Sequence, residues 1–507
     1  MLPPPVERSL AAFVLGSAAW PIIASSTSRQ FRLAFPQSSV VLRAALAGHL
    51  CGVVIAAAWA PLWMLRALVV IGLAWLLGLH AYSAVARGRA RGWPPGSLCP
   101  LRLGPWFDRD FFATEARQLG SPFKTAQFLR PMACFVGLSG GIDFMKQHEA
   151  SLASPPLAFG RFIPGGFLRH MTPERHLATK NVFGAAFARE VFEPLVPFMR
   201  DQLRAELARM VLASDASGGA GVPPRRHIQR AVFAIWARLF FHVEPDSQEL
   251  QRLKTAYRTI DIRNPSQSSD HRIRAALTDI HALLQSKVAQ TADTQTPGSF
   301  LAALVRLRAD ALDDPTLIRN LIYTSHTTWS DISGLLQWVF HMLTEHGAWA
   351  DRLRTEDGAL GELGDTQRSL STRIVSETLR LEQSEFLYRV ATHDIAHDGF
   401  VIPRGWLLRL CVRESHRDPT VFSNPHTFDP DRFLNRTYTR REYSPFGAGL
   451  RHACLGEGLT KVVGSVFAEE LARRHRWQTV TDGPPELSAW RHWRPNSAWR
   501  VVIAHSS

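Results

Sequence analysis

The pattern of apolar and polar positions separates the first ninety or so residues from the rest of the chain. Residues 44–65 and 67–86 are two runs without Asp, Glu, Lys or Arg, and the second has the length needed to cross a bilayer. A weaker apolar run covers residues 10–26. Surface helices of a soluble protein have one apolar and one polar face, whereas these two runs are apolar on all faces. We therefore predict a membrane anchor over residues 1–91 with two spans, a third remaining open.

The flanking charges predict the orientation of this anchor. Arg87, Arg89 and Arg91 follow the second run, and a cluster of arginines after an apolar segment marks the cytoplasmic side. Trp93-Pro-Pro-Gly96 then predicts a stiff hinge, since proline cannot continue a helix. We expect residues 92–507 to form the second domain, on the cytoplasmic side.

Within residues 92–507 the periodicity predicts mostly helices. Amphipathic or apolar helices are expected at 187–212, 231–243, 314–343 and 457–473. Short apolar runs at 132–138 and 407–412 predict strands, and the polar stretch 286–299 predicts a surface connection.

Composition narrows the class of partner and the compartment. The net charge is +14, which favours acidic partners or anionic membrane surfaces. The basic residues are spread without a nucleic-acid-binding module, so we expect no nucleic acid partner. Five widely scattered cysteines form no metal-binding or paired framework, which suits a reducing compartment.

One cysteine has a distinctive setting. Cys454 follows a glycine-rich turn, Phe446 to Gly449, and precedes the helix expected at 457–473. A thiolate at a helix N-terminus is stabilised by unpaired backbone amides, and an anionic sulfur suits a haem iron as axial ligand. The simpler alternative is a buried free cysteine after a turn.

The loop around Cys454 resembles the haem-binding loop of the cytochrome P450 family, Phe-x-x-Gly-x-Arg-x-Cys-x-Gly. Phe446, Gly449, Arg451, Cys454 and Gly456 match, with one extra residue before the cysteine. Counted back from the cysteine, His452 takes the basic position. The resemblance implies a bound haem b whose iron is ligated by Cys454, with Phe446, Arg451 and His452 around it.

Further motifs occur in the family's order. Glu377-Thr-Leu-Arg380 resembles its Glu-x-x-Arg element, which Arg432 completes as a three-residue salt-bridge network. Arg389 falls where the family has an arginine that binds a haem propionate. Upstream, His176 and Lys180 resemble its Trp-x-x-x-Arg element, and their i, i+4 spacing places both on one helix face. Without the family, such a pair is usually a solvated face.

The helix at 314–343 resembles the family's oxygen-binding helix, but its acid–threonine pair is altered. In the ungapped register Thr327 and Thr328 take the small-residue positions, Ser330 the acid and Asp331 the proton-steering threonine. Shifted by one turn, His326, Thr327 and Thr328 fill these roles instead. Asp331 is expected either to relay protons or to pair with a nearby base.

The resemblance implies a mainly α fold with small β-sheets and a membrane-anchored haem–thiolate monooxygenase. Such an enzyme would insert oxygen from O₂ into a hydrophobic small molecule, a lipid or secondary metabolite. Electrons would come from NADPH-cytochrome P450 reductase or another donor. Localisation would be the endoplasmic reticulum if the source is eukaryotic. Two alternatives stay open: a P450-type isomerase or dehydratase without O₂ activation, and a non-catalytic membrane-anchored haem or lipid binder.

Overall fold

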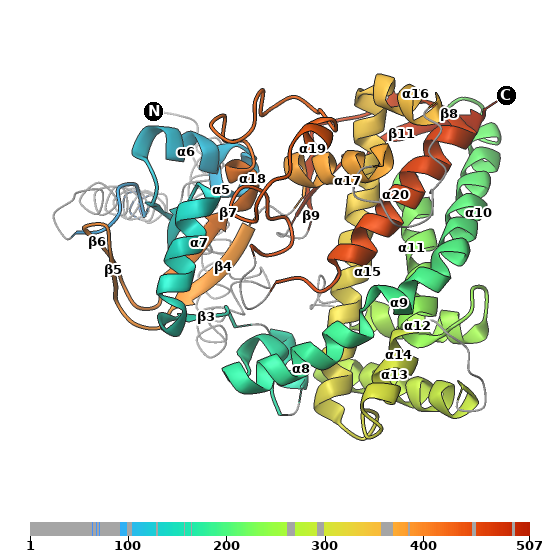
Figure 1. Ribbon diagram of the computed structural model, residues 1–507, viewed down its shortest axis with the longest axis horizontal. Helices are drawn as coiled ribbons and strands as arrows, with labels where there is room; N and C mark the ends of the chain where they lie inside the picture. Colours follow the sequence, from blue (N-terminus) through green and yellow to red (C-terminus); the bar gives the residue numbers. More distant parts are fainter. Residues whose placement is uncertain are drawn as a thin grey trace. The chain divides into compact units, whose positions relative to one another are not determined.

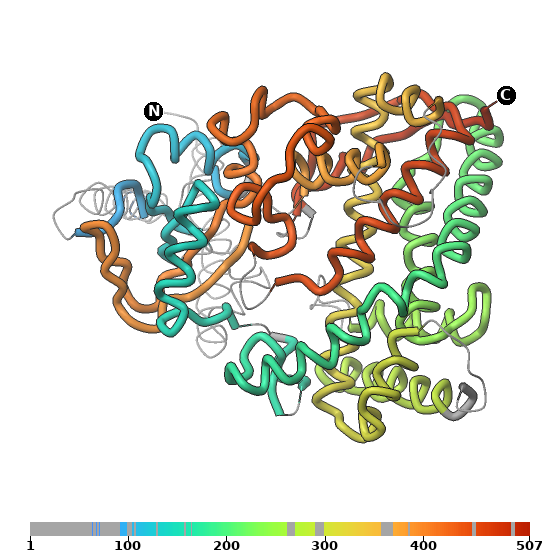
Figure 2. The backbone as a smooth tube through the Cα atoms, in the orientation of Figure 1, coloured from blue at the N-terminus to red at the C-terminus, as the bar shows by residue number. Residues whose placement is uncertain are grey.

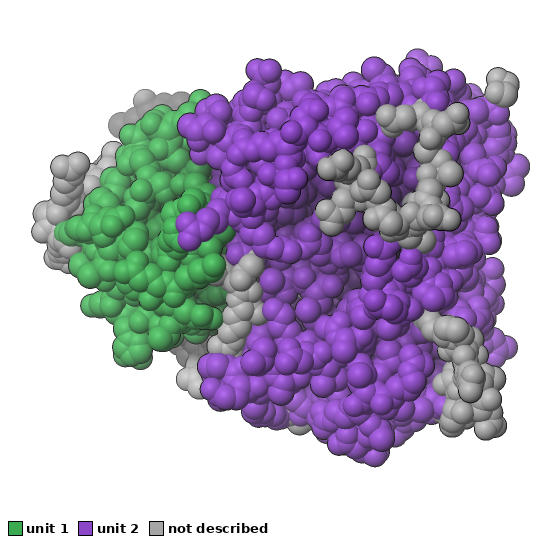
Figure 3. Space-filling model, in the orientation of Figure 1, with its two compact units in different colours: residues 1–158, 386–414 green, residues 159–385, 415–507 purple. Residues whose placement is uncertain are grey.

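The computed structural model describes residues 92–98, 104–127, 130–156, 158–163, 165–260, 269–291, 299–355, 369–383, 386–448, 453–488 and 492–506, together with Trp63, Ala67 and Val70. The chain divides into two compact units (Figure 3). Unit 1 consists of residues 1–158 and 386–414, and unit 2 of residues 159–385 and 415–507. Each unit therefore combines two separate stretches of the chain.

Unit 1 is built on a five-stranded mixed sheet with the order β1-β2-β7-β4-β3. Strands β7, β4 and β3 of this sheet are labelled in Figure 1. Strands β2 and β7 run parallel with Met132 opposite Leu407, so the two stretches of unit 1 are joined through the sheet. The other neighbours in this sheet are antiparallel, and β5 and β6 form a separate hairpin. The elements are α5 Gly104–Phe107, α6 Phe111–Leu119, β1 Phe123–Gln127, β2 Arg130–Phe135, α7 Leu138–Gln147, β3 Leu152–Ala153, β4 Phe386–Ala391, β5 Ile395–His397, β6 Phe400–Ile402 and β7 Leu407–Cys411, with α18 Val412–Ser415 at the unit boundary.

Alternating apolar residues give this sheet its core. Side chains two positions apart point to the same face of a strand. Residues of β1, β2 and β7 spaced in this way pack with helix α6 in one buried cluster, Phe111, Phe112, Phe123, Met132, Cys134, Leu407 and Cys411. The strands predicted at 132–138 and 407–412 are confirmed as β2 and β7.

Unit 2 is mainly helical, with two antiparallel strand pairs, β8–β11 and β9–β10. Together the units confirm the predicted mainly α fold with small sheets. The helices are α8 Pro173–Ala186, α9 Arg189–Phe192, α10 Val196–Asp215, α11 Pro224–Phe241, α12 Gln248–Thr259, α13 Asp270–Thr291, α14 Phe300–Leu307, α15 Pro315–Glu345, α16 Gly347–Thr355, α17 Leu370–Leu381, α19 Arg432–Asn435 and α20 Glu457–Arg474. The strands are β8 His475–Thr481, β9 Glu486–Ser488, β10 His492–Arg494 and β11 Arg500–His505.

The 31-residue helix α15 is the longest element, and its start is as predicted. The Asp314 Oδ1 accepts hydrogen bonds from the backbone N–H groups of Thr316 (2.9 Å) and Leu317 (3.1 Å), and Pro315 occupies the first turn. Helix α15 contacts α11, α17 and α20. In Figure 2, α20 runs in red beside the yellow α15. The helix predicted at 457–473 is confirmed as α20.

Two predicted boundaries were wrong. The helix expected at 187–212 is interrupted, because Pro194 and Pro197 each lack the N–H that a continuous helix needs; α9 ends at Phe192 and α10 begins at Val196. The connection expected at 286–299 is still helical up to Thr291. The buried stripe of α13 continues from Leu283 to Lys287, which forms an ion pair with Glu249, Nζ to Oε1 2.7 Å.

The predicted membrane anchor falls almost wholly on residues outside those described. Among the described residues, no helix combines the length and apolarity that crossing a bilayer requires. The anchor over residues 1–91 therefore stays a prediction.

Candidate functional site

The loop before Cys454 is closed by a backbone hydrogen bond. The Cys454 N–H donates to the carbonyl of Phe446 at 2.8 Å, and Phe446 is buried. Gly447 and Ala448 between them have φ angles of 102° and 60°. Glycine adopts such angles without steric cost, which explains its place in this turn. Residues Arg451 and His452 lie outside the described residues, so their predicted roles at the haem stay predictions.

The Cys454 sulfur lies at the N-terminus of α20. The N–H of Gly456, the residue that caps this helix, donates to Sγ at 3.3 Å. Burial raises the pKa of the thiol overall, and this hydrogen bond offsets part of the rise. Yet Cys454 retains accessible surface. The sulfur is therefore surrounded by protein atoms but still accessible to a ligand.

Two cations lie close to this sulfur. Arg169 lowers the pKa of the Cys454 thiol electrostatically. Burial lowers the pKa of Lys180, and the negative charge of Cys454 works against that lowering. Lys180 and the buried His176 both belong to α8, as the i, i+4 spacing predicted. The structure thus brings Lys180 near Cys454, with Arg169 as an additional cation.

Glu377, Arg380 and Arg432 meet in a network with almost no exposure to solvent. The two Glu377 oxygens accept from Arg380 Nε and Nη2, both at 2.7 Å, and Oε1 also accepts from Arg432 Nε at 3.0 Å. Each partner thereby has the charge and the hydrogen bonds that a buried ion needs.

His416 connects this network to the cysteine loop. Its carbonyl accepts from Arg380 Nη1 at 2.8 Å, and its ring Nε2 accepts from the N–H of Ser444 at 3.0 Å. Burial, followed by the charge of Arg380, lowers the pKa of His416 to about 3. The imidazole is therefore neutral at physiological pH, as an acceptor for Ser444 must be. Tyr443 adds a hydrogen bond from its hydroxyl to the Ser376 carbonyl, 2.9 Å.

The centre of α15 carries the altered oxygen-helix residues. The hydroxyls of Thr327 and Thr328 both donate to the carbonyl of Thr324, at 2.8 and 3.0 Å. Ser330 is partly buried. The Asp331 side chain is 54% exposed, and its negative charge raises the pKa of the Cys454 thiol. Asp331 is thus electrostatically linked to Cys454 in the structure.

Sequence reasoning missed two residues around α15. His492 of β10 places its Nε2 4.0 Å from Asp331 Oδ1, so the base near Asp331 is a histidine. Arg494, also on β10, is buried against Gly334; a Cβ at Gly334 would come 2.0 Å from Arg494 Cζ. No short sequence motif could have predicted either contact, because β10 and α15 are far apart in sequence.

Arg389 lies in β4 of unit 1 and donates from Nη1 to the Tyr388 carbonyl at 2.7 Å. Cys454 belongs to unit 2, so the predicted propionate contact of Arg389 stays a prediction.

Comparison with known proteins agrees with this arrangement. The Cytochrome P450 family model matches residues 271–494, which include α15, the Glu377 network and Cys454. This chain belongs to the cytochrome P450 family. The P450 is 24% identical to abscisic acid 8'-hydroxylase 3 of Oryza sativa subsp. indica, over 81% of this chain and 88% of the relative. It is 24% identical to cytochrome P450 26A1 of Xenopus laevis, over 77% of this chain and 86% of the relative.

Solved structures share the fold of this P450. Retinoic acid-bound cyanobacterial CYP120A1 aligns with a TM-score of 0.65 and 22% sequence identity, covering 80% of this chain and 96% of that chain. A zebrafish cytochrome P450 with progesterone aligns with a TM-score of 0.61 and 18% identity, covering 77% and 98%. These structures show the fold, while the family match and the relatives make the chain a P450 oxidoreductase. Membership of this family implies haem–thiolate chemistry, an electron donor and a small-molecule substrate.

The residues present fit a haem. Cys454 offers a solvent-accessible sulfur at a helix N-terminus, and the hydrogen bond from Gly456 to that sulfur favours the thiolate. Lys180 and Arg169 supply positive charge nearby, as the carboxylates of haem propionates require. When bound, the haem supplies oxygen activation, which an electron-donating thiolate ligand promotes. Cys454 would ligate the iron, and the cations would hold the propionates.

Proposed function

We propose that this P450 inserts one oxygen atom of O₂ into an apolar small molecule. The other oxygen atom becomes water, and NADPH supplies two electrons through a reductase: RH + O₂ + NADPH + H⁺ gives ROH + H₂O + NADP⁺. The observation that carries the proposal is the Cys454 sulfur, enclosed at the N-terminus of α20 and linked electrostatically to Asp331 on α15. This arrangement supplies a thiolate and a polar group for proton delivery within one unit.

The role proposed for α15 is proton delivery. Asp331 and His492 form an acid–base pair whose nearest atoms are 4.0 Å apart, a distance that one intervening water can bridge. Because the hydroxyl protons of Thr327 and Thr328 are directed to Thr324, these oxygens are available as acceptors. We propose that Asp331 moves the proton, while Ser330, Thr327 and Thr328 orient water beside it.

The proposed substrate class is an isoprenoid carboxylic acid. Abscisic acid 8'-hydroxylases are among the relatives, and retinoic acid occupies the cyanobacterial structure. Both compounds join an apolar isoprenoid body to one carboxylate. Such a substrate also suits the prediction of a lipid or secondary metabolite. We therefore take abscisic acid and retinoic acid as the first candidates for turnover.

The proposed enzyme works at a membrane, anchored through residues 1–91 with its haem domain in the cytoplasm. The two charge-free runs and the arginines that follow them support this placement. Truncations ending between Arg87 and Pro95 should still incorporate haem. Loss of haem in all of them would contradict a separate anchor.

The proposal is tested by product analysis under ¹⁸O₂ with NADPH, a P450 reductase and each candidate acid. Hydroxylated product should carry one ¹⁸O atom and should require both NADPH and O₂. Turnover that needs neither would favour the isomerase or dehydratase alternative, for which the altered acid–threonine pair of α15 is the supporting observation. Binding of substrate without any turnover would favour the non-catalytic alternative.

A further inference from the structure

A cavity lies beside α15, and Cys454 is not among the residues that line it. It has a volume of about 860 Å³ and is lined by residues of α10, α11 and α12 and by Trp329 of α15. Trp329 and Asp331 are two residues apart, which is about 200° around a helix, so their side chains leave opposite sides of α15. Asp331 is the residue linked to Cys454, whereas the Trp329 ring packs against Phe233 of α11 with centroids 5.7 Å apart. The cavity is therefore separate from the haem site.

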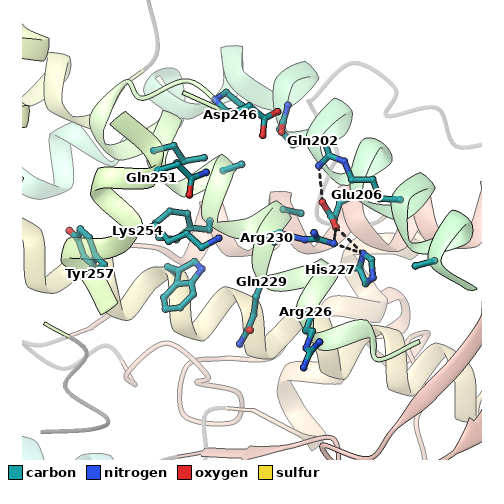
Figure 4. A pocket seen from close by; sticks show the side chains of 18 of the residues that line it. Gln202, Glu206, Arg226, His227, Gln229, Arg230, Asp246, Gln251, Lys254 and Tyr257 are labelled. Atoms are coloured by element: carbon teal, nitrogen blue, oxygen red, sulfur yellow. Dashed lines mark hydrogen bonds and ion pairs between the residues drawn. The ribbon is translucent and has the colours of Figure 1, made fainter. Parts of the chain in front are cut away.

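Positive charge dominates the lining of this cavity. Five lining residues are Arg or Lys and two are acidic: Arg209, Arg226, Arg230, Lys254, Arg258, Glu206 and Asp246. The cations form two stripes, since Arg226 and Arg230 are spaced i, i+4 on α11, and Lys254 and Arg258 are spaced i, i+4 on α12. Figure 4 shows Lys254 and Arg230 on neighbouring sides of the hollow.

Glu206 neutralises only part of this charge. Its carboxylate accepts from Arg209 (2.9 Å), Arg230 (2.7 Å) and His227 Nδ1 (2.8 Å). Burial raises the pKa of Glu206, but the hydrogen bonds from His227 and Arg209 and the charge of Arg230 bring it below its ordinary value. Glu206 is therefore ionised and already used by its own neighbours.

Three other cations of the lining differ from Arg209 and Arg230, which are paired with Glu206. Across the part of the chain that the structure describes, Arg226, Lys254 and Arg258 form no ion pair with a carboxylate. Within the described residues, Asp246, the other acidic lining residue, forms no ion pair with any of these cations. A ligand anion would supply the negative charge that the protein itself does not place there.

The inner wall adds an apolar surface. Phe233, Leu250 and Val222 are buried lining residues, and the Trp329 ring joins them. The amides of Gln229 and Gln251 also line the cavity and can donate hydrogen bonds. Its volume lies within the roughly 300–1,000 Å³ usual for small-molecule sites. The lining thus matches a molecule that is apolar at one end and anionic at the other.

We propose that this cavity binds an amphiphilic organic anion, a hydrocarbon body carrying one carboxylate or phosphate. Arg226, Lys254 and Arg258 hold the headgroup, and Phe233 and Trp329 contact the hydrocarbon. The site is distinct from the one proposed for oxidation. Because Trp329 and Asp331 lie within one turn of α15, a ligand here contacts the same helix that borders the haem site.

The test is calorimetric titration of the holoenzyme with monomeric dodecyl phosphate, after the iron has been saturated with imidazole to close the haem site. One equivalent should bind, and the Soret band should stay unchanged. Lys254→Gln and Arg258→Gln should each weaken binding about tenfold or more, since each removes a charge-assisted contact. Arg252→Gln is the matched control, because Arg252 is exposed on the same helix but does not line the cavity.

Further titrations separate the contribution of the anionic headgroup from that of the hydrocarbon chain. Inorganic phosphate and dodecanol should each bind at least tenfold more weakly than dodecyl phosphate, and dodecanoate should bind comparably. Asp246→Asn should tighten binding, because it removes the acidic lining residue that no cation neutralises. Equal loss in Arg252→Gln, equal affinity for inorganic phosphate, or loss of binding when imidazole fills the haem site would each overturn the proposal. These outcomes do not depend on turnover of any substrate.

Discussion

Two regions of unit 2 hold polar side chains in opposite ways. In the proximal cluster, Glu377, Arg380, Arg432, His416 and Cys454, buried polar groups are held by hydrogen bonds, several of which join residues far apart in sequence. In the α15 centre, residues 324–331, the threonine hydroxyls bond to their own helix, and Asp331 is more than half exposed. The polar groups of the proximal cluster are thus held by surrounding residues, whereas the α15 centre leaves Asp331 accessible to water.

The difference follows from the cost of burial. A buried ion that loses its partner is strongly unfavourable, so the proximal cluster tolerates little change. An exposed carboxylate 4.0 Å from a histidine keeps its solvation and can exchange protons. We therefore expect substitutions in the proximal cluster to remove haem or stability, and substitutions in the α15 centre to alter turnover alone.

The largest effect is expected at Cys454. Cys454→Ala should abolish the red-shifted Soret band of the reduced protein with carbon monoxide, because no other residue is positioned to supply the thiolate in this loop. Cys134→Ala is the control; Cys134 is a free cysteine buried in unit 1 and should leave the band in place. A Cys454→Ala protein that keeps the band would overturn the ligand assignment.

The next largest effect is expected at Glu377. Glu377→Gln leaves two buried guanidinium groups without their carboxylate, and should lower the free energy of unfolding by about 3–5 kcal/mol. Urea denaturation measures this change. Glu193→Gln, which breaks an exposed i, i+4 pair with Arg189, should cost about 0.5 kcal/mol or less. Similar losses in both variants would contradict the contrast between buried and exposed charges.

The pH dependence of stability should report on His416. Its pKa of about 3 in the folded protein lies below the ordinary value of a histidine, so the unfolded chain binds the extra proton. Stability from this residue is therefore complete above about pH 6.5, an ordinary histidine pKa, and is lost as the pH falls.

Between pH 6.5 and 5 the loss should be about 2 kcal/mol, at roughly 1.4 kcal/mol per pH unit. Comparing denaturation curves of the wild type and His416→Gln over this range isolates the contribution from those of other histidines. A His416→Gln protein with the same slope of unfolding free energy against pH would show that folding does not lower the pKa of His416.

The smallest effect in free energy is expected in the α15 centre. Asp331→Asn should slow product formation about tenfold, equivalent to about 1.4 kcal/mol, while peroxide released without product rises. Haem content and unfolding free energy should stay at wild-type values, since Asp331 makes no buried ion pair. His492→Gln should give a similar but weaker change.

Turnover that is unaffected by Asp331→Asn, yet requires NADPH and O₂, would assign proton delivery to Thr327 or Thr328. That outcome would place the functional residues one helical turn earlier. It would leave the contrast between the proximal cluster and the α15 centre in place.

Local sequence determined much of this P450. Asp314 and Pro315 predicted the start of α15 because capping and the fixed proline φ act within a few residues. The spacing of Glu377 and Arg380 on one helix face, and the glycine turn before Cys454, are local in the same sense. Family resemblance supplied Arg432 as the third member of the network.

Tertiary structure alone decided the rest. Three features depend on elements that are distant in sequence: the electrostatic effect of Arg169 on Cys454, the approach of His492 to Asp331, and the hydrogen bonds of His416 with Arg380 and Ser444. The cationic cavity depends on α10, α11 and α12 meeting at Trp329. A charged residue on a helix has the same local pattern whether it is paired or not. Only packing decides which carboxylate reaches it, and thus where positive charge is left for a ligand.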